Sequence, residues 1–175
     1  MRRAALLTAL VAAALAGATA AGAAPPAAGG PCSLPDPGLQ VRQVGRYVVT
    51  LKVGPVPRMY TAAQARQLKP TTGVVMLEPM QAVAGGSMQG GAGQRHLRVQ
   101  VCDAATGKPL RTPRPKAEVT AGMNRFAVPL TLGYDAGRPA TEWRFCNTLR
   151  VGDEALSVGV AVGGELAAFS VLPGA

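Results

Sequence analysis

The residues of this chain best suited to chemistry are sulfur and imidazole side chains around a glycine-rich segment. Met80 and Met88 precede His96, the only histidine of the 175 residues. Thioethers and imidazole are soft ligands, and together they suit Cu(I). The glycine-rich stretch between them offers little side-chain bulk, so the methionines can fold back towards the imidazole. The spacing therefore predicts a candidate metal site of Met80, Met88 and His96. The alternative is that Met76 fills the core and that His96 is a surface residue at the start of a strand.

Signatures of catalysis are missing from the sequence. The four serines stand outside a G-x-S-x-G elbow. No H-E-x-x-H, C-x-x-C or P-loop pattern occurs. Asp and Glu number only nine, and no pair of them suggests glycosidase work. We therefore expect a protein that is not an enzyme.

Alternating hydrophobicity predicts the elements that would position these side chains. Between residues 96 and 103, Leu97, Val99 and Val101 alternate with polar neighbours, as in a half-buried strand. Further strands are expected at 46–53, 73–78, 116–121, 126–132, 142–151, 155–162 and 165–172, with a short helix at 62–68 after an N-cap at Thr61. The predicted fold class is all-β, an immunoglobulin-like antiparallel β-sandwich of about seven strands with one short helix.

The amino-terminal residues predict export. Arg2 and Arg3 precede a small-apolar run from Ala4 to Leu15, and A-x-A arrangements follow, which is the layout of a secretory signal peptide. The apolar run is too short to span a bilayer stably. We expect a signal peptide at 1–23, a flexible Ala/Pro/Gly-rich lead-in at 24–44 and the β-sandwich domain at 45–173. The mature chain, without a transmembrane segment, is then expected in the periplasm or outside the cell.

Charge and cysteine content bear on the partners and the compartment. The formal net charge is +9. Either the charge only keeps a small domain soluble, or it favours an anionic cell-surface component or an envelope protein as partner. Nucleic acid is not expected as a partner, because the basic residues are scattered and few aromatic residues lie among them. Outside the cytoplasm two of the three cysteines, Cys32, Cys102 and Cys146, are expected to form a disulfide, and their spacing alone leaves the pairing open.

Several segments resemble a family of exported bacterial β-sandwich proteins grouped with periplasmic iron- and copper-uptake proteins. They read VVTLKVGPVPRMYTAAQ, PTTGVVML, RHLRVQVCDAATGKPL and FCNTLRV, and they cover most of the mature chain. Such relatives carry a Met- and Gly-rich loop before the R-H-L strand, a second histidine in that strand and a later H-Y-G-N-N segment. Here Gln100 stands at the position of the strand histidine, and the residues 144–148, Arg-Phe-Cys-Asn-Thr, replace the later segment. The resemblance thus implies the fold, together with a metal site that is degenerate or reduced to a methionine-based Cu(I) site.

The same resemblance implies a disulfide between Cys102 and Cys146. Each lies two residues beyond a position attributed to the family's site, and they would be neighbours if the two strands ran parallel. Cys32 would then be free or would tether the amino-terminal tail. The predicted function is an exported, non-catalytic β-sandwich binding or interaction module of the bacterial cell envelope. The alternative is an extracytoplasmic Cu(I)-type metal-binding protein that uses Met and His ligands.

Overall fold

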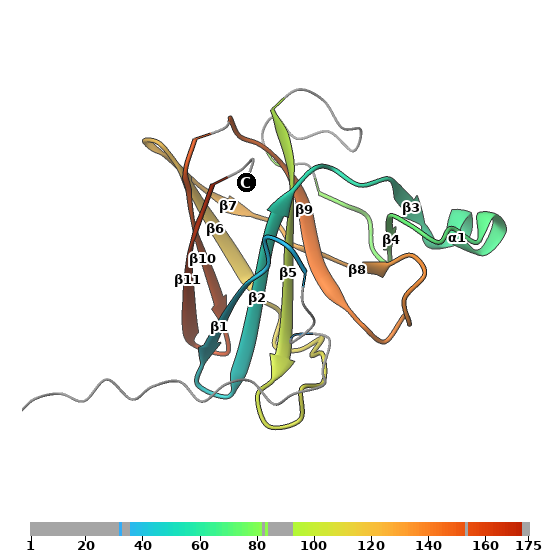
Figure 1. Ribbon diagram of the computed structural model, residues 1–175, viewed down its shortest axis with the longest axis horizontal. Coiled ribbons are helices and arrows are strands. Elements are labelled where there is room, and N and C mark those ends of the chain that lie inside the picture. The colour runs from blue at the N-terminus through green and yellow to red at the C-terminus, as the bar shows by residue number, and fades with distance from the viewer. Residues whose placement is uncertain (1–31, 33–35, 82, 84–92, 153, 173–175) are drawn as a thin grey trace, which may run out of the picture.

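Two β-sheets make up the folded part of the protein. The computed structural model describes residues 32, 36–81, 83, 93–152 and 154–172. One sheet contains β1 (Gln40–Val44), β2 (Tyr47–Gly54), β3 (Met59–Thr61), β4 (Val74–Met76), β5 (Gln94–Asp103), β8 (Thr131–Asp135) and β9 (Arg144–Arg150), in the order β1-β2-β5-β9-β8-β4-β3. The other contains β6 (Lys116–Ala121), β7 (Asn124–Val128), β10 (Leu156–Val162) and β11 (Glu165–Val171), in the order β11-β10-β6-β7. The predicted class, an all-β sandwich with one short helix, is confirmed (Figure 1).

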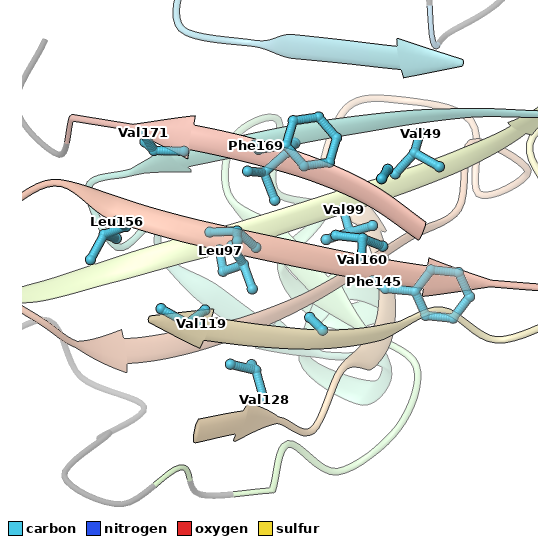
Figure 2. Packing of buried hydrophobic residues seen from close by; sticks show 14 of the residues in the cluster. Val49, Leu97, Val99, Val119, Val128, Phe145, Leu156, Val160, Phe169 and Val171 are labelled. Carbon is cyan, nitrogen blue, oxygen red and sulfur yellow. The ribbon is translucent and has the colours of Figure 1, made fainter. Parts of the chain in front are cut away.

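The core lies between the two sheets and is built mainly from valine and leucine. Alternate side chains of β5, namely Leu97, Val99 and Val101, point into it and are almost completely buried. Figure 2 shows Val119, Leu156, Val160 and Phe169 of the four-stranded sheet with Val49, Val99 and Phe145 of the other sheet. Because strand side chains alternate, the remaining side chains of β2, β5 and β9 point away from the four-stranded sheet. We call this side of the seven-stranded sheet the outward face.

The helix α1 (Ala62–Leu68) begins and ends where the sequence predicts. Thr61 Oγ1 accepts a hydrogen bond from the Gln64 backbone N–H at 3.2 Å, and Gln64 Oε1 accepts one from the Thr61 N–H at 2.8 Å. This capping box satisfies two backbone donors at the helix start. Lys69 then adopts φ +47° and Pro70 follows, so the helix stops. Figure 1 shows α1 with β3, β4 and β8 extending to one side of the sandwich.

The structure has more strands than the sequence predicts, for local reasons. The stretch expected as one strand at 126–132 forms β7 and β8, which lie in different sheets. Pro129, between them, has no backbone N–H for a ladder. The strand β1 lies within residues 24–44, the expected lead-in, and pairs with β2. The short β3 pairs with β4 in parallel, so the sandwich is not purely antiparallel.

The prediction of a disulfide between Cys102 and Cys146 is wrong. Cys102 is bonded to Cys32, and Cys146 is a free, buried thiol. The strands β5 and β9 run antiparallel, with Arg98 opposite Cys146. Cys102 is four residues further along β5, about 13 Å from the position that faces Cys146. No disulfide spans that distance.

The observed pairing predicts different effects for the cysteines. Replacing both Cys32 and Cys102 by Ala should lower the free energy of unfolding by about 2–5 kcal/mol, because the bridge closes a long loop in the unfolded chain. Urea unfolding measures this. Peptide mapping without reductant should find Cys32 linked to Cys102 in the wild type and also in Cys146→Ala. A peptide that joins Cys102 to Cys146 would contradict the structure.

Candidate metal-binding site

The outward face of the seven-stranded sheet carries polar side chains that are nevertheless buried. On β9, Arg144, Cys146 and Thr148 point outward and are 5%, 0% and 1% exposed. On β5, Gln94 and His96 point outward and are also buried. A sheet face of polar residues normally meets water. Because the polar side chains of the outward face are buried, this face is a candidate binding site.

Two side chains bring sulfur atoms together on this face. The Cys146 Sγ lies 3.8 Å from the Met76 Sδ. Gly133 stands between them in the sheet, paired with Met76 on one side and with Arg144 on the other. A Cβ at Gly133 would lie 3.5 Å from the Met76 Sδ, so the methionine side chain runs over the bare glycine. We call the buried cluster that contains Met76 and Cys146 the sulfur cluster. Met80 is half-buried and packs against it.

The imidazole of His96 has no hydrogen-bond partner. The buried side-chain polar atoms that lack a partner in the described part of the chain are Gln94 Oε1, both ring nitrogens of His96, and Thr148 Oγ1. His96 and Thr148 face one another across β5 and β9, and Gln94 is two residues before His96 on the same face. Each unsatisfied buried polar group costs about 1–3 kcal/mol. Such a concentration of unpaired atoms is typical of a site that a ligand completes.

The unpaired imidazole and the thiol are near neighbours. Since Arg98 faces Cys146 and His96 faces Thr148, His96 lies diagonally across from Cys146 on the outward face. Diagonal neighbours in an antiparallel pair have Cβ atoms on the order of 7 Å apart. At this spacing we take the two side chains as candidate ligands of a single ion. The candidate site is therefore Met76, Cys146 and His96, with Met80 beside them.

Charged side chains lie next to this site. Arg98 and Arg144 both pair with Asp135, and Asp36 pairs with Arg98 and with Lys52. The three cations of this network outnumber its two carboxylates, Asp36 and Asp135, so it carries an excess of positive charge. Burial, followed by the charge of Arg98, lowers the pKa of the Arg144 guanidinium to about 9. The site therefore disfavours added positive charge.

The His96 ring is in the form that binds a metal ion, whereas the Cys146 thiol must first lose its proton. Burial, with help from Arg144 and Arg98, lowers the pKa of His96 from 6.5 to about 4, so the ring is neutral and has a free lone pair at neutral pH. Burial raises the pKa of the Cys146 thiol to about 12, against the opposing effect of the two guanidinium groups. Among the described residues, no three His, Cys, Asp or Glu side chains gather to hold a metal. A metal here would depend on thioether sulfur.

The structure places two of the three residues predicted to bind a metal ion. His96 lies on β5 but is buried rather than at the surface, and Met80 packs against the sulfur cluster. Met88 lies outside the described residues. The sequence prediction did not include Cys146, which it assigned to a disulfide, or Met76, for which a place in the core was the alternative. Strand alternation puts Val74 and Met76 on one face and Val75 on the other. Only the pairing of Met76 with Gly133 shows that Met76 lies on the outward face.

Comparison with known proteins finds a distant similarity. No protein-family model and no curated protein sequence matches the chain. A crystal structure of a DUF4426 family protein from Pseudomonas aeruginosa PAO1 is similar over 77% of this chain and 91% of that chain, with 14% sequence identity and a TM-score of 0.45. A similarity at this level carries no argument about function, and it does not bear on the resemblance to iron- and copper-uptake proteins. In the described residues, no helix is long and apolar enough to cross a bilayer.

The buried neutral imidazole predicts a pH-dependent stability in the absence of metal. Between pH 6.5 and about 4 the unfolded chain binds a proton at His96 that the folded protein does not, so the free energy of unfolding falls as the pH is lowered. The shift from 6.5 to about 4 corresponds to roughly 3 kcal/mol. His96→Leu should lack this loss when urea unfolding is compared at pH 4 and pH 7. Parallel pH profiles of the two proteins would show that the ring is not buried in its neutral form.

Proposed function

We propose that this protein is an exported, non-catalytic binding domain of the bacterial cell envelope whose ligand is a soft monovalent metal ion of the Cu(I) type. Export is supported by the signal-peptide pattern at 1–23 and by the Cys32–Cys102 disulfide, which fits an oxidising compartment. A non-catalytic role is supported by the missing catalytic motifs in the sequence. Binding of this ion is the proposed function of the domain.

The observation that carries the proposal is the unpaired His96 beside a pair of sulfur atoms. His96 is 6% exposed, and neither of its ring nitrogens has a partner. Diagonally across from it, the Cys146 thiol contacts the Met76 thioether at 3.8 Å. Imidazole, thiolate and thioether form a ligand set that suits Cu(I). Met80 is the fourth member of the proposed set, and Met88 stays a candidate on its sequence position alone.

The charges favour a monovalent ion over a divalent one. Binding converts the Cys146 thiol to a thiolate, and one Cu(I) with one thiolate adds no net charge to the site. A divalent ion with the same ligands would add a positive charge next to Arg98 and Arg144, which together with Lys52 already outnumber Asp36 and Asp135. Like charges at short range in a buried site repel strongly. Selectivity for Cu(I) or Ag(I) over Zn²⁺ follows.

An anaerobic competition titration with bathocuproine tests the proposal on the mature chain from about Ala24. We expect one Cu(I) per protein. Cys146→Ala, Met76→Leu and His96→Leu should each weaken binding by more than about tenfold, a loss typical of a disturbed metal site. Met→Leu nearly conserves side-chain volume, so the loss would be chemical rather than structural.

A matched control comes from a methionine remote from the site. Met123 is fully exposed between β6 and β7, and Met123→Leu should bind Cu(I) like the wild type. Unchanged affinity in a triple variant of Cys146, Met76 and His96 would reject these ligands. A wild type that binds no Cu(I) would reject the metal function. The domain would then be a basic interaction module for an anionic surface component or an envelope protein.

A further inference from the structure

A pocket beside the sulfur cluster is lined by two of the proposed ligands, Met76 and Met80, and by further residues that the ligand set does not include. A cavity of about 520 Å³ is lined by Met59 and Tyr60 of β3, by the first turn of α1 and by the stretch from Met76 to Met80. We call it the methionine pocket, because three of its lining residues are methionines. Met76 belongs both to this pocket and to the contact with Cys146. The cavity therefore extends up to the candidate site.

The three methionines differ in burial along the pocket. Met76 is buried, whereas Met59 and Met80 are half-buried. Met59 pairs with Val74 in the parallel ladder, and Thr61 pairs with Met76, so Met59 is one diagonal step from Met76. Met80 packs against the Cys146 cluster, but Met59 is not part of it. Met59 is thus a thioether at the pocket wall, outside the site itself.

Two polar side chains of the pocket wall are engaged elsewhere. Glu78, the only carboxylate in the lining, pairs with Arg114. The Gln64 carbonyl accepts from the Thr61 backbone in the capping box. What the wall offers a ligand is therefore mainly apolar surface and thioether sulfur. Such a surface receives a soft ion and offers little to a hard, hydrated one.

The helix α1 serves the pocket rather than the core. None of its residues is buried, and its first turn forms part of the pocket wall. The capping box fixes that turn directly after Met59 and Tyr60. An exposed seven-residue helix would be marginal by itself, and packing on the core does not explain it here. Its contribution is to close the pocket around the thioethers.

We infer that the methionine pocket is the entry route of the metal ion, and that Met59 is a transfer ligand that receives Cu(I) from a donor and passes it to Met76 and Cys146. The inference rests on the proposed function. The ion leaves a ligand of its donor as it binds the Met59 thioether, and it then leaves Met59 as it binds Met76, Cys146 and His96, so each bond broken is replaced by a new one and no electron is transferred. The one proton displaced, that of the Cys146 thiol, passes to solvent. Met59 then affects the rate of loading but not the final affinity.

Stopped-flow transfer of Cu(I) from its bathocuproine complex to the mature chain tests the inference, with the absorbance of the complex as the signal. Met59→Leu should slow transfer by about tenfold, equivalent to about 1.4 kcal/mol in the barrier. Its equilibrium affinity should equal that of the wild type. Ala63→Phe, at an exposed position of the pocket wall, should slow transfer without removing sulfur. Met123→Leu is the control and should load at the wild-type rate.

The outcomes separate this inference from the proposed function. Equal transfer rates for the wild type and Met59→Leu would overturn the entry route while Cu(I) binding itself stands. A loss of equilibrium affinity in Met59→Leu would also overturn it, because Met59 would then belong to the final site. A wild type that takes no Cu(I) at equilibrium would instead reject the proposed function, and the entry route with it. Urea unfolding of both pocket variants checks that they fold.

Discussion

The antiparallel pairing of β5 with β9 is the constraint on which the rest of the structure depends. Leu97, Val99 and Phe145 put one face of this pair into the core, and their burial sets the register. A slip of one residue would expose these side chains, so the register is strongly specified. The same register decides every neighbour on the outward face. It sets Cys146 opposite Arg98, and His96 diagonally across from Cys146.

Burial of that outward face has an energetic consequence. Two kinds of contact hold the amino-terminal segment on the outward face: the disulfide between Cys32 and Cys102, and the ion pairs of Asp36. Met76 covers Cys146 on the same face. Buried charges are tolerated because they are paired, as Arg144 is with Asp135. The atoms of Gln94, His96 and Thr148 lack such partners. The contrast between a satisfied charge network and unsatisfied neighbours a few residues away marks the candidate site.

The positions that the family resemblance associates with metal binding have other uses here. Gln100 donates to the Trp143 carbonyl at 2.9 Å, and Arg144 is tied to Asp135, so neither is a ligand. The soft atoms are instead Cys146, two residues along β9, and Met76, which reaches it over Gly133. Glycine is required at position 133, because the Cβ of any other residue there would lie 2.8 Å from the Val75 carbonyl oxygen. The chain thus combines a sandwich fold with a pair of sulfur side chains on the outward face.

The sequence by itself determined the class of fold, the helix at 62–68 and the strand faces of Leu97, Val99 and Val101, because hydrophobic alternation and capping are local properties of the chain. It also proposed Met80, Met88 and His96 as candidate ligands from residue type, which stays a prediction. Only the tertiary structure decided that Cys32 bonds to Cys102 and that Cys146 is a free thiol against Met76. The reason is that strand direction and register bring together residues 70 positions apart, and no local pattern records whether two strands run parallel or antiparallel.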